Sequence, residues 1–139
     1  MEELIELRSH IEQKRYGDAL SLIGEMEEMS IDDKISKIES FLDILLLHLI
    51  KQHAEKRTTR SWKGSILNAA DMIRRTNKRR KAGGYYLSRE DLQEAVNESW
   101  RTALRRASFE AFEGRYDDSE LAEMVDDAQI KEEALEVIS

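Results

Sequence analysis

Hydrophobic residues recur at spacings of three and four along most of this chain, a pattern typical of amphipathic helices. The clearest run comprises Ile31, Ile35, Ile38, Leu42, Leu45 and Leu49. In its second half the remaining directions around the helix are also apolar, because they are filled by Ile44, Leu46, Leu47 and Ile50. A helix that is apolar on nearly every side must be covered on most of them. We therefore predict a long apolar central helix near 32–54.

The residues before this helix show the same periodicity in two shorter pieces. Apolar positions predict one helix over about 2–14 and another over about 18–29, with a turn at 16–18 between them. Ser30, followed three residues later by Asp33, has the form of a capping box and is expected to begin the central helix. Residues 1–29 are thus predicted to form an N-terminal helical hairpin.

A second long helix is predicted after a break at 55–60. Ser61 can cap its start, and the glycine pair at 83–84 is expected to end it. Its predicted core face consists of Trp62, Ile66, Ala69, Ile73 and Thr76. We expect Trp62 to anchor the core at the start of this helix rather than to stack on a nucleic-acid base.

The last third of the chain is predicted to be helical and acidic. Ser88 with Asp91 marks another capped helix start, for a helix that ends near Gly114. A final helical segment is expected over about 119–138, with a break near Gln129. These segments form the acidic C-terminal helices of 88–139.

The predicted fold is an all-α, single-domain bundle of about five to six helices. It consists of the hairpin at 1–29, two long central helices within 30–81 and the acidic helices of 88–139. A length of 139 residues suits one hydrophobic core. The chain has no proline, which favours long uninterrupted helices.

Charge divides the sequence into two parts of opposite sign. Residues 51–81 carry eleven Lys or Arg and two acids, whereas the other 108 residues carry 27 acids and eleven basic side chains. The overall net charge of −7 therefore conceals a strongly basic segment. Such asymmetry concerns partners rather than fold. Either the segment attracts an anionic partner, or it neutralises the acidic helices of its own chain.

The leading hypothesis is a non-catalytic binding protein that uses this basic segment to meet RNA or an acidic protein. On a helical wheel the later cations of the segment fall on one edge of the second long helix, and two arginines precede that helix. The candidate partner-binding residues are Arg57, Arg60, Lys63, Arg74, Lys78 and Lys81. The alternative is a homo-oligomeric structural protein. In that case the apolar second half of the central helix is the self-association seam, and the basic segment only neutralises acidic helices.

Recognisable catalytic and metal-binding patterns are missing from the sequence, so we predict no enzyme, no cofactor and no metal. His48 and His53 are five residues apart and would point away from each other on a helix. The absence of cysteine excludes disulfides and thiolate chemistry. The longest apolar run is far shorter than a membrane span, and the N-terminus is acidic rather than signal-like, so a cytoplasmic location is expected.

Three stretches carry a resemblance to a known family. They are LLLHLIK at 45–51, RTTRSW at 57–62 and NKRRKAGGYYL at 77–87. They are similar to motifs of domain of unknown function family twenty-nine, small helical proteins common in cyanobacteria. The resemblance implies an all-helical bundle and supplies no activity. Many relatives begin with a Tyr-Asp-x-Asp segment followed by tryptophan, which this chain lacks.

Overall fold

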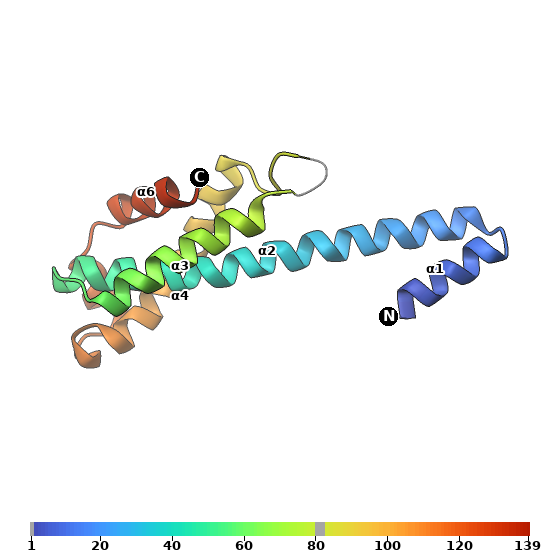
Figure 1. Ribbon diagram of the computed structural model, residues 1–139. Helices are drawn as coiled ribbons and strands as arrows, with labels where there is room; N and C mark the ends of the chain where they lie inside the picture. Colours follow the sequence, from blue (N-terminus) through green and yellow to red (C-terminus); the bar gives the residue numbers. More distant parts are fainter. Residues whose placement is uncertain (1, 80–82) are drawn as a thin grey trace. The chain divides into compact units, whose positions relative to one another are not determined.

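The structure is a computed structural model that describes residues 2–79 and 83–139. These residues form six α-helices, one short 3₁₀ helix and an isolated antiparallel bridge between Lys78 and Tyr85 (Figure 1). The elements are α1 (Glu2–Glu12), α2 (Tyr16–Glu55), α3 (Arg60–Asn77), α4 (Arg89–Glu110), η1 (Ala111–Gly114), α5 (Asp118–Glu123) and α6 (Asp127–Ile138). The predicted all-α class and number of helices are confirmed.

The chain divides into two compact units, Met1–Lys34 and Ile35–Ser139. The first contains α1 and the beginning of α2, joined by a tight turn in which Lys14 has a positive φ of 59°. Ala19 and Leu22 are its buried apolar residues among those described. The prediction that 1–139 forms one domain stays a prediction.

The helix boundary expected at Ser30 is wrong. α2 begins at Tyr16 and passes through Ser30 without a break. Its sequence between Met26 and Asp33 contains neither glycine nor proline, and Ser30 and Asp33 lie exposed on a continuous helix. Side chains that can cap a helix are also tolerated on its solvent face, where water satisfies their hydrogen bonds.

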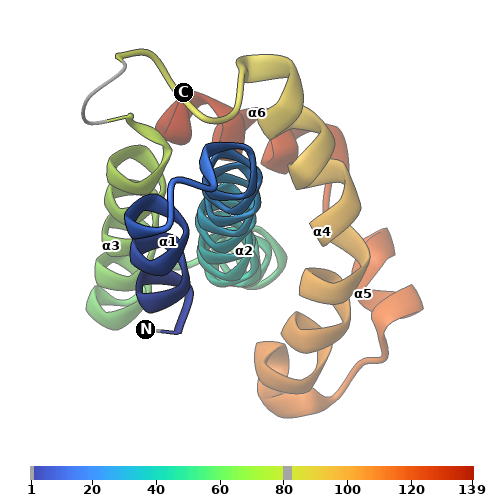
Figure 2. The ribbon, with the colours of Figure 1, turned by 90° about the vertical axis from the view of Figure 1, so that its right-hand side faces the viewer.

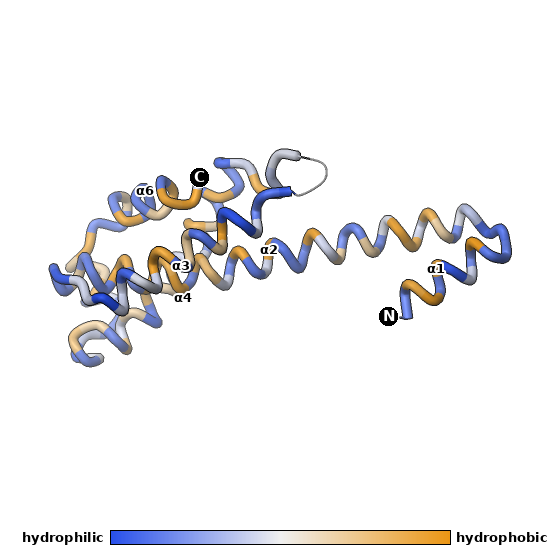
Figure 3. Tube along the Cα trace, viewed as in Figure 1, coloured by the Kyte–Doolittle hydropathy of each residue, from blue (hydrophilic) through white to orange (hydrophobic). Residues whose placement is uncertain are grey.

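The hydrophobic core lies in the C-terminal unit and is built around the part of α2 within it. That part lies between α3 and α4, and α6 contacts both of those helices (Figure 2). Hydrophobic and hydrophilic positions alternate along the helices, so each can turn an apolar side inward (Figure 3). The largest side chains with less than 2% exposure are Ile38, Leu42, Leu45, Leu46, Ile50, Ile73, Val96, Leu121 and Ile130.

The second half of α2 is buried within its own unit, and its role as a self-association seam stays a prediction. Leu46 is fully buried and Leu47 is 4% exposed, and both belong to the core of their own unit. Ile44 is partly buried against the same core. Apolar character on every side of a helix is satisfied here by intramolecular neighbours, so a second copy of the chain is not needed to cover it.

The capping signals are partly correct. Ser88 and Asp91 form the predicted capping box at the start of α4. α3, however, is capped by Thr59, whose hydroxyl accepts a hydrogen bond from the Trp62 amide at 3.0 Å, rather than by Ser61. It ends at Asn77 instead of the glycine pair. Lys78 is extended and pairs with Tyr85, and this pairing competes with continuation of the helix.

The C-terminal acidic region is interrupted earlier than expected. α5 ends at Glu123, and Asp126 caps α6 by accepting from the Gln129 amide at 3.2 Å, so the predicted break near Gln129 is misplaced. Before α5 the chain reverses through η1, where Phe112 and Glu113 have positive φ values of 51° and 56°. This reversal returns α5 to contact α4.

Candidate functional site

The six candidate cations do not share one helix edge. Arg57 lies between α2 and α3, Arg60 and Lys63 lie in the first turn of α3, and Arg74 lies in its last turn. Lys78 follows the helix in extended backbone, so its position on a helical wheel has no meaning. Lys81 lies outside the described residues. The described candidates therefore form two groups at opposite ends of α3, an 18-residue helix about 27 Å long.

At the N-terminal end of α3, two cations lie over the ring of Trp62. Lys51 Nζ and Arg57 Cζ lie 4.6 and 4.7 Å from the centroid of its ring. Cations at this distance are attracted by the negative face of the indole. Trp62 is half-buried, and its contacts with these cations leave less of its ring for a ligand. Among the described residues it is not part of the core cluster, so its expected role as a core anchor stays a prediction.

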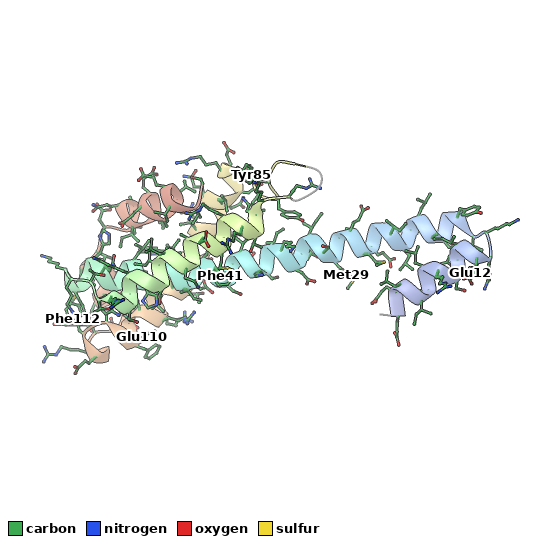
Figure 4. The ribbon with its side chains drawn as sticks, in the orientation of Figure 1. Glu12, Met29, Phe41, Tyr85, Glu110 and Phe112 are labelled. Atoms are coloured by element: carbon green, nitrogen blue, oxygen red, sulfur yellow. The ribbon has the colours of Figure 1, made fainter. Side chains whose placement is uncertain are left out.

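Carboxylates of the same unit also hold these two cations. Buried Lys51 donates from Nζ to Glu110 Oε1 at 3.1 Å, and Arg57 donates from Nε to Glu55 Oε1 at 3.0 Å. The other oxygen of Glu55 accepts from the Phe112 amide at 3.2 Å. Figure 4 shows Glu110 and Phe112 at this end of the unit. Arg57 therefore serves the packing of the α2–α3 junction.

Arg60 and Lys63 are exposed like Arg57, but they differ from it in having no carboxylate partner among the described residues. Among the residues that the structure describes, neither has a carboxylate within 4.0 Å. The sequence predicted Lys63 on the basic edge of the helix and Arg60 before it, whereas the structure places both in the first turn of α3.

At the C-terminal end of α3, cations border a surface pocket. Arg74 and Lys78 lie on it together with Arg89 from the start of α4. The pocket has a volume of about 470 Å³, and Tyr85, Leu87 and Ile138 are the large apolar residues that line it. Its remaining lining residues are Asn77, Ser88 and Ser139.

The two arginines of this pocket are held in place by α6. Arg74 donates to the Val137 carbonyl and lies 3.8 Å from Asp71, whereas Arg89 donates to Ser139 Oγ at 2.6 Å. Arg89 also lies 3.6 Å from Glu132. Each arginine side chain is about half exposed. These contacts fix the positions of two positive charges at the pocket.

Asn77 fixes the segment around Leu87, which lines the same pocket as Arg74 and Arg89. Its side chain is buried, donates to the Leu87 carbonyl at 3.1 Å and accepts from the Leu87 amide at 2.7 Å. The Asn77 carbonyl in turn accepts from the Tyr86 amide at 2.9 Å. The segment that carries Tyr85 is therefore tied to the end of α3, while the Tyr85 side chain remains 66% exposed.

Among the residues in 2–79 and 83–139, the acidic C-terminal helices form no ion pair with Arg60, Lys63 or Lys78. Within the described residues, Asp127 pairs with Lys131, Glu132 with Arg89 and Glu133 with His53, the last at 2.7 Å. Asp117 and Asp126 are occupied as helix caps. Within the part of the chain that the structure describes, ion pairs of the basic segment thus use Lys51, His53, Arg57, Arg74 and Arg75, and leave Arg60, Lys63 and Lys78 without a carboxylate within 4.0 Å.

Asp43 and His48 are two half-buried titratable residues of α2. Burial lowers the pKa of His48, and the nearby charge of Lys51 lowers it further, whereas Glu110 acts in the opposite direction. His48 Nδ1 is buried without a hydrogen-bond partner. Burial also raises the pKa of Asp43, against the influence of Arg106.

Sequence reasoning missed Lys51, Arg89 and Tyr85 as residues that shape the site. Lys51 is the first residue of the basic segment, but its buried ammonium is paired with Glu110, which lies 59 residues away in the sequence. Arg89 depends likewise on Ser139, 50 residues away. Local spacing contains no signal for either contact. Tyr85 follows the glycine pair at 83–84, where a chain reversal alone could explain it, and its exposure is not encoded by local spacing.

The fold and site together define a small all-α protein with exposed cations at both ends of one helix. The chain belongs to the family described as domain of unknown function DUF29, whose model matches residues 4–126. Comparisons with curated proteins and with solved structures found no match. In the described part of the chain, no helix has the length and apolar character to cross a membrane.

Proposed function

We propose that this protein is a non-catalytic binding protein whose exposed cations at the two ends of α3 meet an acidic partner protein. The observation that supports the proposal is that some cations of the basic segment have carboxylate partners and others do not. Lys51 and Arg57 have carboxylate partners, whereas the exposed Arg60, Lys63 and Lys78 have none within 4.0 Å among the described residues. Exposed like charges that remain uncompensated favour association with an opposite charge.

An acidic protein fits this surface better than RNA. Proteins that bind single-stranded RNA stack its bases on aromatic faces. Here Trp62 already contacts Lys51 and Arg57, and Tyr86 lies under Arg79, whose Cζ is 5.5 Å from the ring centroid. Displacing these cations would cost their interaction with the rings. The chain as a whole also carries a net charge of −7, which repels an extended polyanion outside the cationic surface.

The cytoplasm is the proposed site of action. The chain has no cysteine and so requires no oxidising compartment. Its source is proposed to be a cyanobacterium, as the family resemblance suggests.

Charge reversal tests the proposal. The variant Arg60→Glu, Lys63→Glu, Lys78→Glu leaves the buried and paired cations untouched. A matched control reverses three exposed cations elsewhere, Arg15, Arg101 and Arg105, so that net charge changes equally. Both proteins and the wild type are used to capture partners from cyanobacterial lysate, with and without nuclease.

The proposal predicts that the wild type captures a protein in a salt-sensitive manner and that nuclease does not abolish this capture. The variant Arg60→Glu, Lys63→Glu, Lys78→Glu is expected to lose the captured protein, and the control variant is expected to retain it. Capture abolished by nuclease would identify a nucleic acid and overturn the choice of an acidic protein. Equal capture by all three proteins would show that these cations are not the binding surface.

A further inference from the structure

The pocket at the C-terminal end of α3 combines positive charge with an apolar surface. Arg74, Lys78 and Arg89 supply positive charge, and Tyr85 supplies a large exposed apolar surface beside them. A volume of about 470 Å³ lies within the range of sites that enclose a small ligand or one large side chain.

The pocket is also organised before any partner arrives. Asn77 holds Leu87 through two hydrogen bonds, and α6 holds the two arginines. Lys78 is exposed, and its backbone is fixed by the bridge to Tyr85. Side chains that are already ordered lose less conformational entropy when they bind. Figure 4 shows Tyr85 at this end of the unit, away from Glu110 and Phe112.

We propose that this pocket is the anchor site for an acidic peptide segment that carries one large apolar side chain. The apolar side chain packs against Tyr85, Leu87 and Ile138, and neighbouring carboxylates face the three cations. The inference rests on the proposed function and names where the acidic partner is held. Apolar anchors set into a pocket with a charged rim are a common source of specificity at protein interfaces.

An acidic partner is favoured over a neutral one by charge complementarity. Asp71 and Glu132 lie at 3.8 and 3.6 Å from Arg74 and Arg89, but both arginines remain half exposed, and Lys78 has no carboxylate within 4.0 Å among the described residues. A carboxylate that reaches a guanidinium in this arrangement forms a charge-assisted hydrogen bond. A purely acidic peptide would satisfy the cations and leave the apolar lining exposed to water.

The experiment compares two short glutamate-rich fluorescent peptides by anisotropy. One has a central phenylalanine, and in the other that residue is serine. The wild type is expected to bind the phenylalanine peptide about tenfold more tightly, since burying one aromatic side chain contributes on this scale. Tyr85→Ser is expected to remove this preference while leaving the weaker serine peptide bound as before.

Leu67→Ser is the matched control, because Leu67 is 70% exposed on α3 and does not line the pocket. This variant is expected to keep the full preference. Both substituted residues are exposed, so far-UV circular dichroism should match the wild type. Lys78→Glu is expected to weaken both peptides and to reduce their sensitivity to salt.

The outcomes separate the two proposals. Equal binding of both peptides by the wild type, or a preference that survives Tyr85→Ser, overturns the anchor pocket and leaves the cationic surface intact. Failure of Arg60→Glu, Lys63→Glu, Lys78→Glu to weaken either peptide overturns the proposed function itself. Displacement of both peptides by a single-stranded RNA oligonucleotide that binds more tightly would overturn the choice of a peptide.

Discussion

Lys51 shows how a basic residue can belong to the core rather than to a binding surface. Its side chain is 7% exposed, its ammonium contacts Glu110 and it lies over the Trp62 ring. Taking a charge out of water is costly unless a partner compensates it. The local sequence could predict that 51–81 is basic, but not that Lys51 is enclosed, because its compensating carboxylate, Glu110, comes from α4.

Removing Glu110 tests this reading of Lys51. Glu110→Gln leaves a buried ammonium with a weaker partner, and we expect the free energy of unfolding to fall by about 1 to 2 kcal/mol. Lys51→Met removes the charge with similar volume and is expected to change it by less than about 1 kcal/mol. Urea denaturation measures both. A larger loss for Lys51→Met than for Glu110→Gln would contradict the argument.

His48 makes stability depend on pH. Its folded pKa lies below the ordinary value of 6.5, mainly because of burial, so the unfolded chain takes up a proton at higher pH than the folded chain does. The free energy of unfolding therefore decreases as pH falls below 6.5. Lys51, Glu110 and Arg106 are the charged groups that act on it.

Replacing the imidazole should flatten this dependence. His48→Leu removes the titrating group and the unpartnered Nδ1, so we expect a smaller loss of stability between about pH 7.5 and 5.5. Urea denaturation of both proteins at the two pH values gives the comparison. Asp43 is present in both proteins, so its contribution cancels in the comparison; its raised pKa acts with the opposite sign, since stability falls as pH rises above 3.8 toward the folded pKa. If the free energy of unfolding decreased between these two pH values as much in the variant as in the wild type, His48 would be excluded as the cause of the pH dependence.

At the scale of elements, hydrophobic periodicity located the helices better than it located their ends. The capping box of α4 was predicted correctly because both of its residues are local. The start of α3 was not, since Thr59 and Ser61 are equally good caps in sequence and only backbone geometry selects Thr59. The pairing of Lys78 with Tyr85 and the positive φ angles of Phe112 and Glu113 depend on contacts that spacing does not encode.

The choice between the two caps has a simple thermodynamic test. Thr59→Ala removes the hydroxyl that accepts from the Trp62 amide, and we expect a loss of about 1 kcal/mol in the free energy of unfolding. Ser61→Ala, at the exposed position two residues later, should change it by less than about 0.5 kcal/mol. Thermal or urea denaturation distinguishes them. The reverse order would mean that Ser61 caps the helix in solution.

At the scale of the whole molecule, the composition and periodicity were sufficient for the all-α class. They did not predict that the compact units would meet at Lys34 and Ile35, because α2 spans that boundary as one helix. Burial is also unequal between the units. Every member of the buried apolar core cluster lies at or beyond Ile38, whereas Ala19 and Leu22 are buried in the N-terminal unit.

This inequality predicts different behaviour for the two isolated units. A fragment of residues 35–139 is expected to stay helical and to unfold in one cooperative transition, because it retains the core. A peptide of residues 1–34 buries too little apolar surface to offset its chain entropy and should be largely unfolded. Circular dichroism during heating measures both. A gradual, non-cooperative transition in the longer fragment would show that its core is insufficient.

Arg74 and Arg89 hold the last turn of α6 from two different helices, through the Val137 carbonyl and Ser139 Oγ. Any anion that engages these guanidinium groups must therefore either share them with α6 or compete with it. Thermodynamic linkage makes the effect reciprocal: the fraying equilibrium of this helix end and the affinity for the anion depend on each other. Amide hydrogen exchange at the end of α6 would report occupancy of a pocket formed mainly by other elements.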